Sequence, residues 1–162
     1  MPELQRLAPE HADALLAFEL ENREWFARTV PDRGDEYFAR FADRLAALLA
    51  EQATGRCHFH LLLADAEVLG RFNLVDVSDG EAELGYRVAQ RIAGRGVASD
   101  GVRRVIALAR EAYGLRRLTA VATLDNPASL AVLRRTGFVP DGAVSVAGRP
   151  GLRQVLSLVA EE

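Results

Sequence analysis

The chain has 162 residues, of which 49% are hydrophobic and 27% charged, an ordinary balance for a globular protein. Its net charge of −3 does not favour bulk nucleic-acid binding, and all 20 basic residues are arginines, which excludes a Schiff-base lysine and a Walker-A lysine. The single cysteine, Cys57, excludes an intramolecular disulfide and a cysteine-rich zinc site.

No apolar run approaches the ~20 residues that a membrane helix needs, and the first residues carry charges without a long apolar stretch. We therefore expect a cytoplasmic protein that binds neither membranes nor nucleic acid. A chain of this length is expected to form a single domain over residues 1–162, since no repeat or linker divides it.

The first third of the chain predicts two helices behind a short strand. The strand is expected over 4–7, and Pro9 opens a helical stretch that runs to about Arg23. A loop follows over 28–36. The second helix ends near Thr54, and its apolar side chains recur at three- and four-residue steps: Phe38, Phe41, Leu45, Leu48 and Leu49.

The middle of the chain predicts a three-stranded meander. Strand-like runs over 57–64 and 68–77 form a hairpin, and a third strand covers 81–88. An arginine- and glycine-rich loop over 89–96 leads into the clearest helix, 97–113. That helix has an apolar stripe of Val102, Val105, Ile106 and Ala109.

The last third predicts a strand over 118–123 and a helix from Pro127 to Gly137, with Asn126 as its N-cap. A closing hairpin is expected over 143–147 and 152–159. Helices followed by a meander and a strand–helix–strand unit indicate an α+β fold with one mixed sheet.

The loop before the clearest helix suits a diphosphate group. Gly94 and Gly96 let the backbone approach a ligand closely. The first N–H groups of the helix lack intrahelical partners and, with the positive end of the helix dipole, attract phosphate. Arg91 and Arg95 add charge-assisted donors. The same residues are also compatible with a plain turn that carries two solvated arginines.

A dinucleotide-binding fold is the weaker interpretation of this loop. It would need a third glycine where Ser99 stands and an acidic residue about 20 positions further on, whereas Asp125 lies too far along. With a single strand–helix–strand unit, a nucleotide-linked oxidoreductase that binds NAD is disfavoured.

The eight residues Arg91-Ile92-Ala93-Gly94-Arg95-Gly96-Val97-Ala98 match the R/Q-x-x-G-x-G/A signature of the GNAT superfamily of acetyl-CoA-dependent N-acetyltransferases. The chain also resembles the RimJ/RimL-type branch, the ribosomal-protein N-acetyltransferases, in three further segments. These are Asn22–Trp25, Ala82–Tyr86, and Asn126–Ser129 followed by Arg134–Phe138. The segments occur in the order of that branch and cover most of the chain.

The resemblance implies a mixed, mostly antiparallel sheet of about seven strands, flanked by helices and splayed between the strands 81–88 and 117–123. Acetyl-CoA would enter that gap as cosubstrate, without a metal. Residues of the strand end, the loop and the next helix would bind it: Tyr86, Arg87, Val88, Arg91, Gly94, Arg95, Gly96, Val97, Ala98, Ser99, Asn126, Ser129 and Arg134. Arg134 is equally compatible with a solvated surface position.

The transfer needs a base for the amine and a donor for the leaving thiolate. By resemblance Ser129 lies near the thioester sulfur, and it takes the donor role because Leu133 stands where many family members have a tyrosine. Backbone N–H near Val88 could stabilise the oxyanion. Glu83 is the first candidate base, although it could instead pair with an arginine at the sheet edge. Asp76 and Glu67 are weaker candidates.

On the acceptor side, Trp25 could line the binding site or be an ordinary core contact. His58 and His60 could line the acceptor cleft, act as base, or be ordinary hydrogen-bonded histidines; they lack a third ligand for a metal site. The branch implies a protein or peptide N terminus as acceptor, attacked directly in a ternary complex. A small-molecule amine acceptor and a non-catalytic acyl-CoA-binding regulatory module remain alternatives, and a homodimer is plausible by resemblance.

Overall fold

The computed structural model describes residues 2–159. A single seven-stranded sheet runs through this part of the chain in the order β1-β2-β3-β4-β5-β7-β6. The strands are β1 (Glu3–Arg6), β2 (His58–Ala64), β3 (Glu67–Ser78), β4 (Glu81–Val88), β5 (Arg117–Thr123), β6 (Val139–Val146) and β7 (Arg149–Ser157). Neighbouring strands are antiparallel except β4 and β5, which are parallel. The expected mixed, mostly antiparallel sheet is therefore confirmed.

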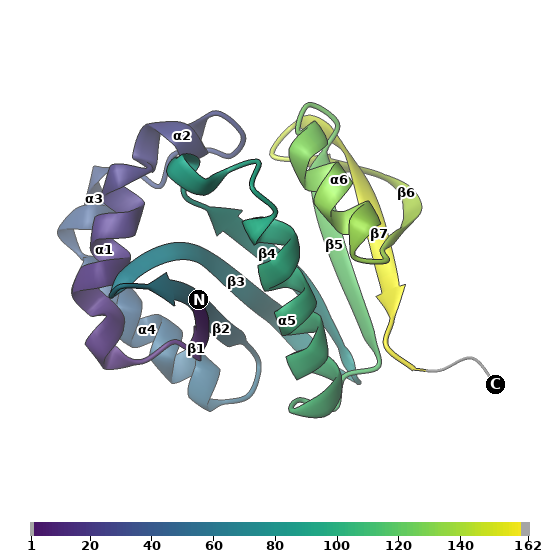
Figure 1. Ribbon diagram of the computed structural model, residues 1–162, viewed down its shortest axis with the longest axis horizontal. Coiled ribbons are helices and arrows are strands. Elements are labelled where there is room, and N and C mark those ends of the chain that lie inside the picture. The colour runs from purple at the N-terminus through teal and green to yellow at the C-terminus, as the bar shows by residue number, and fades with distance from the viewer. Residues whose placement is uncertain (1, 160–162) are drawn as a thin grey trace.

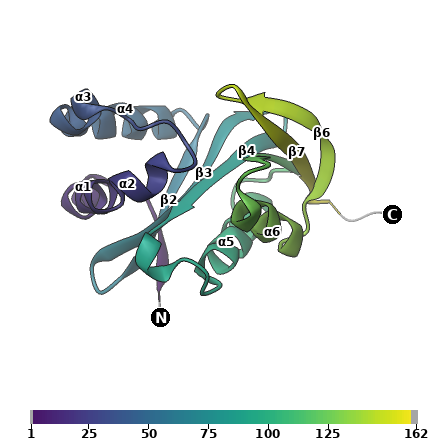
Figure 2. The same ribbon diagram turned by 90° about the horizontal axis from the view of Figure 1, so that it is seen from above.

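The helices cover both faces of the sheet (Figure 2). On one face lie α1 (Ala12–Glu21), α2 (Arg23–Ala27), α3 (Asp35–Ala39) and α4 (Phe41–Ala53), and on the other lie α5 (Val97–Glu111) and α6 (Pro127–Arg135). Two short 3₁₀ helices, η1 (Pro9–His11) and η2 (Gln90–Ile92), precede α1 and α5. No helix among residues 2–159 is long and apolar enough to cross a membrane.

Side-chain alternation along the strands builds two cores. On β4, Ala82 and Leu84 are buried in the core beneath α5, whereas Glu83 has the opposite parity and points to the face of α1–α4. The predicted stripe of α5 is buried in the same core. The helix packs closely because Gly101 has no side chain, since a β-carbon there would overlap the ring of Phe72.

The predicted helical stretch from Pro9 to about Arg23 is confirmed as η1 and α1, with one correction: the chain turns at Asn22, and the separate helix α2 follows. Asn22 has φ −106° and ψ 11°, and its Nδ2 donates to the Phe18 carbonyl at 2.9 Å. Its Oδ1 accepts from the backbone N–H of Gln90 at 3.0 Å, so the corner is fixed to the start of η2.

The prediction for the second helix needs a similar correction. Helical structure begins at Asp35, inside the predicted loop, and is interrupted at Arg40, where φ is −111° and ψ is 29°. The apolar stripe continues from α3 into α4, so the spacing of apolar residues did not reveal the break. The closing hairpin also begins earlier than expected, with β6 at Val139 and β7 at Arg149.

Candidate active site

The central feature of the molecule is the point where β4 and β5 part (Figure 1). The two strands pair from Glu81–Arg117 to Leu84–Ala120, and β5 then continues beside β7 alone. The Ala89 N–H donates to the Leu69 carbonyl at 2.8 Å, on the β3 side. Because strand backbone groups alternate in direction, the N–H and C=O groups of Tyr86 and Val88 point to the open side.

The η2–α5 loop lies at the end of this free strand edge. Gly94 and Gly96 both have φ of 78°, and Gly96 is the left-handed N-cap of α5. A β-carbon built on either glycine meets no atom within 4 Å, so the backbone is open on that side. The N–H groups of residues 97–99 form the first turn, where intrahelical acceptors are lacking. These groups suit an anionic ligand, as the sequence indicated.

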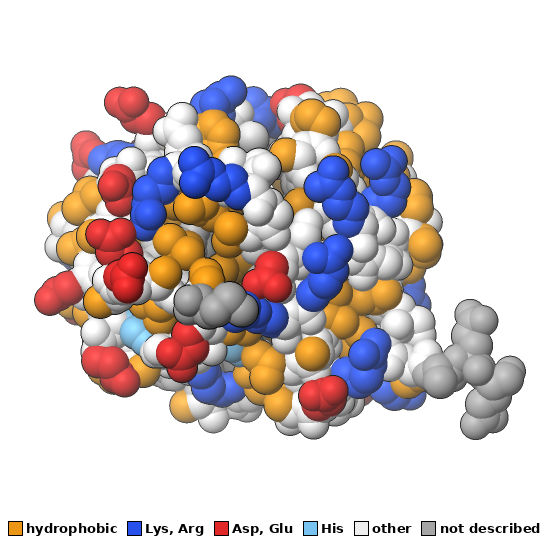
Figure 3. Space-filling view, viewed as in Figure 1, with side chains coloured by type: hydrophobic (Ala, Val, Ile, Leu, Met, Phe, Trp, Pro, Cys, Tyr) orange, Lys and Arg blue, Asp and Glu red, His pale blue; other side chains and the backbone are white. Residues whose placement is uncertain are grey.

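The arginines near the loop differ in their partners. Arg91 directs its guanidinium to Glu67 at the β2–β3 turn, with an Nη2–Oε2 distance of 2.8 Å. Arg95 and Arg134 are exposed and form no ion pair within residues 2–159. Arginine side chains gather around the η2–α5 segment and α6 on the face shown in Figure 3. This face therefore offers cationic side chains beyond the backbone donors.

Across the gap, α6 brings a hydroxyl group to β4. Asn126 Oδ1 accepts from the Ser129 N–H at 3.2 Å and caps the helix, which leaves its Nδ2 as a donor. Ser129 Oγ lies 2.9 Å from the hydroxyl oxygen of Tyr86. Burial raises the pKa of Tyr86, so this hydroxyl stays protonated at neutral pH. Leu133, where a tyrosine is common in the family, is buried in the core.

Glu83 lies on the opposite face of β4 from Ser129, beside the last β4–β5 pair. It forms no ion pair and no side-chain hydrogen bond within residues 2–159, so the alternative of an arginine partner is not realised there. On the same face, a β-carbon at Gly85 would meet no atom within 4 Å. Asn73 lies opposite Gly85 in the sheet, and its buried Oδ1 has no hydrogen-bond partner in this part of the chain.

The two weaker candidate bases lie elsewhere. Glu67 is at the β2–β3 turn and pairs with Arg91. Asp76 is exposed at the irregular part of β3, with φ of 53°, where the β3–β4 register shifts. Glu83 is therefore the one carboxylate among the three that lies next to the parting strands.

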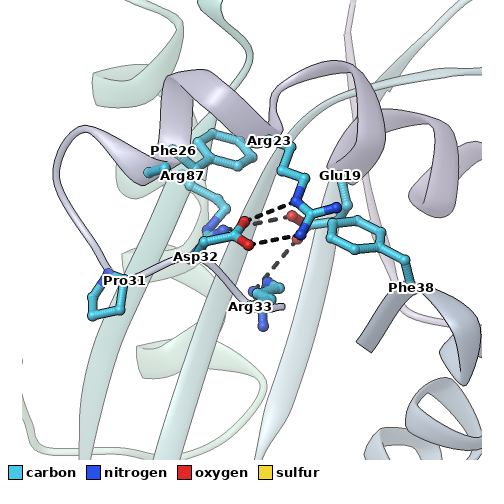
Figure 4. Close-up of a pocket in the computed structure, with 9 residues that line it drawn as sticks. Glu19, Arg23, Phe26, Pro31, Asp32, Arg33, Phe38 and Arg87 are labelled. Atoms are coloured by element: carbon cyan, nitrogen blue, oxygen red, sulfur yellow. Dashed lines mark hydrogen bonds and ion pairs between the residues drawn. The ribbon is translucent and has the colours of Figure 1, made fainter. Parts of the chain in front are cut away.

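A buried ionic cluster that the sequence did not predict lies on the face of Glu83, and Figure 4 shows part of it. Glu19 of α1 is only 1% exposed and pairs with Arg71 at 2.5 Å, Arg33 at 3.4 Å and Arg87 at 3.5 Å. A signal was present, because Glu19 follows the buried Phe18 and lies one turn after Leu15, within the apolar stripe of α1. Arg87 thus directs its side chain to the α1 face, while its backbone remains in the strand end expected to bind the cofactor.

The remaining acceptor-side candidates are split between the two faces. Trp25 on α2 is half-buried beneath the guanidinium of Arg28, 4.8 Å from its ring centre. The ring of His58 stacks on Tyr113 at 3.7 Å, and His60 Nε2 lies 2.6 Å from the Tyr113 hydroxyl. Both histidines therefore pack on the α5 face, away from Glu83, and the geometry favours ordinary hydrogen-bonded histidines. No group of three or more His, Cys, Asp or Glu side chains between residues 2 and 159 could hold a metal ion.

The buried His60 is expected to make the fold acid-sensitive. Burial lowers the pKa of His60 from 6.5 to about 4, despite its hydrogen bond with the Phe72 carbonyl. The unfolded chain binds the proton first, so stability falls as the pH drops from the unfolded to the folded value, by ~3 kcal/mol in total. Urea unfolding at pH 7 and pH 4.5 measures this loss. In His60→Gln the free energy of unfolding should fall clearly less between the two pH values than in the unmodified protein. An equal fall would show that His60 is not the source of the acid sensitivity.

Comparison with known proteins agrees with this geometry. The sequence model of the acetyltransferase (GNAT) domain matches residues 3–139, and the chain belongs to this family. The ribosomal-protein-serine acetyltransferase of Escherichia coli is 23% identical over 150 residues, which cover 90% of this chain and 83% of that protein. Two Bacillus proteins named as N-acetyltransferases are 34% and 32% identical over 83 and 78 residues, so the matches span less than half of their lengths, 45% and 44%.

Solved structures show the same fold. The ribosomal-protein-S5-alanine acetyltransferase of Vibrio fischeri superposes with a TM-score of 0.90 at 18% identity, over 96% of this chain and 92% of that one. RimJ of Mycobacterium smegmatis, solved in complex with a CoA disulfide, gives a TM-score of 0.86 at 24% identity, over 95% and 80% of the two chains. The splayed sheet and the loop described above are thus set in the fold that these acetyltransferases share.

Proposed function

We propose that this chain is an acetyl-CoA-dependent N-acetyltransferase that acts on a protein or peptide N-terminal α-amine by direct transfer. The observation that carries the proposal is that β4 and β5 separate beyond the pair Leu84–Ala120. The free edge of β4 then leads to the first turn of α5. The acceptor class is supported by the names of the relatives, two of which are ribosomal-protein acetyltransferases.

The chemistry of these backbone groups fits acetyl-CoA. The free N–H and C=O groups of Tyr86 and Val88 can pair with the amides of a pantetheine arm, as a neighbouring strand would. The first-turn N–H groups of α5 and the positive-φ Gly94 and Gly96 suit its diphosphate. Bound there, acetyl-CoA supplies the activated acetyl group. The Val88 N–H is then available to donate to the carbonyl oxygen that gains charge during transfer.

Protons are handled on opposite faces of the sheet. On the α1 face, Glu83 takes the proton that the amine loses as its nitrogen bonds to the acetyl carbon, directly or through a water. An α-amine has a pKa of ~7.7–8.0, so a weak base suffices. Asn73 Oδ1, a buried acceptor without a partner within residues 2–159, suits an amine donor on this face. On the α6 face, the Ser129 hydroxyl donates to the sulfur as the C–S bond breaks, while Tyr86 donates to Ser129.

Substitution of Ser129 and Glu83 tests these roles. Ser129→Ala and Glu83→Gln are each expected to lower kcat by about tenfold or more, because general acid–base groups contribute roughly that much or more. Thiol release with an N-terminal peptide measures the rate, and calorimetry shows whether acetyl-CoA still binds. Thr119→Ala, next to Glu83 in the sheet, is the matched control. Unchanged kcat in both variants would refute the assignment, and acetyl-CoA binding without turnover on any amine would favour a non-catalytic module.

A further inference from the structure

The pocket shown in Figure 4 carries positive charge in excess. Arg33, Arg71 and Arg87 share the single carboxylate of Glu19, so the cluster has two more positive than negative charges. Asp32, at the same pocket, and the neighbouring Asp35 are both paired with Arg23, at 2.8 and 2.9 Å, so the four arginines and three carboxylates together still have one positive charge in excess. Burial and the neighbouring Arg33 lower the pKa of Arg87 to about 10. Such charges are costly to bury without further anionic partners.

The guanidinium groups of Arg87 and Arg33 are held in place by aromatic rings and keep N–H groups available to bind a ligand. Arg87 stacks on the ring of Phe26 at 4.5 Å, and Arg33 stacks on Tyr37 at 4.7 Å. Stacking fixes the plane of a guanidinium and leaves its in-plane N–H groups to bind a carboxylate. Their contacts with Glu19, 3.5 and 3.4 Å, are longer than the ~2.7–2.9 Å of a strong charge-assisted hydrogen bond. Their side chains are 24% and 32% exposed, so a ligand can reach them.

The pocket lies within reach of the proposed transfer site. Arg87 is on the same face of β4 as Gly85 and Glu83, and it follows them in the strand by two and four residues. At ~3.4 Å per residue, Arg87 is about 7 Å beyond Gly85, above which the face is open. An extended peptide with its α-amine over Gly85 would bring the side chain of its second or third residue to this pocket.

We propose that the pocket binds a carboxylate of the acceptor, so that the preferred acceptor is a peptide N terminus with Asp or Glu at position two or three. This inference rests on the proposed function and names its substrate class. It also disfavours a polycationic amine as acceptor, because the amine's further charges would face an excess of arginine.

Matched hexapeptides test the proposal. Peptides that begin Ala-Asp, Ala-Asn and Ala-Lys differ in the charge of the second side chain, and kcat/KM is measured for each. We expect at least a tenfold preference for Asp over Asn, carried by KM, and the poorest activity with Lys. In Arg87→Gln and Arg33→Gln the Asp/Asn preference should fall below about threefold. Arg40→Gln, an exposed arginine on the same side of the molecule, should retain it.

A binding measurement separates this proposal from the proposed function. Calorimetry with the same peptides already N-acetylated, in saturating coenzyme A, does not depend on turnover. A preference for Asp in binding, without turnover of any free peptide, would support the pocket and refute the proposed function alone. Equal kcat/KM for Asp and Asn, no binding preference, or a preference untouched in both folded arginine variants would each overturn the proposal.

Discussion

Replacing Ala98 by Asp is expected to lower the affinity for coenzyme A by about 100-fold while the fold is retained. Ala98 is in the first turn of α5, where an acidic side chain favours the helix dipole by ~0.3–1 kcal/mol. The same carboxylate would oppose the proposed diphosphate. Two like charges ~4 Å apart interact by about 4 kcal/mol at an effective dielectric constant of ~20, and ~2.7 kcal/mol corresponds to 100-fold.

Titration calorimetry with coenzyme A measures this effect, and Ala98→Asn is the matched control. Asn has nearly the shape of Asp without its charge, so we expect a loss of less than about fivefold. Thermal unfolding of both variants shows whether the partly buried site tolerates the side chain. Equal affinities for the Asp and Asn variants would show that no anionic group is bound at this helix end.

Replacing Glu19 by Gln is expected to destabilise the fold by about 3–5 kcal/mol. Removal of one partner from a buried ion pair leaves an uncompensated charge, and here three guanidinium groups lose their shared carboxylate. The Nε of Arg71 is already buried without a partner within residues 2–159, so the cluster has no spare acceptor of its own. Urea unfolding at neutral pH measures the change.

Glu21→Gln is the control for this substitution, because Glu21 is exposed at the end of the same helix. It removes the same charge from α1, and we expect a change within about 0.5 kcal/mol. A loss of less than 1 kcal/mol in Glu19→Gln would mean that the arginines find other partners. The cluster would then not be the structural link between α1 and the strands β3 and β4 that its contacts indicate.

The elements that depend on local signals were predictable from the sequence. Strand 81–88 was predicted with its observed bounds, because turn residues flank an alternating pattern. The two loop glycines adopt the positive φ that their lack of a side chain permits. The cofactor side of the candidate site consists largely of backbone groups, which such motifs specify directly.

The acceptor side depends on contacts between distant residues. The turn at Asn22 is fixed by Gln90, 68 positions away, and Glu19 meets Arg71 across 52 positions. No periodicity within a segment contains that information. Parity alone put His58 and His60 on one face together, but only the packing against Tyr113 shows which face it is.

The short β4–β5 junction has a mechanical consequence. Within residues 2–159, β5, β7 and β6 join the other four strands through four parallel residue pairs at one end of the sheet. Beyond that hinge, the Tyr86–Ser129 contact and a hydrogen bond of 3.2 Å from Arg149 to the Thr29 carbonyl bridge the two leaves. A cosubstrate bound between β4 and β5 would form backbone hydrogen bonds where the two strands no longer pair with each other. Binding of the cosubstrate would then stabilise the contact between the two parts of the sheet, β1–β4 and β5–β7. We therefore expect these parts to separate less readily in the bound protein than in the free protein.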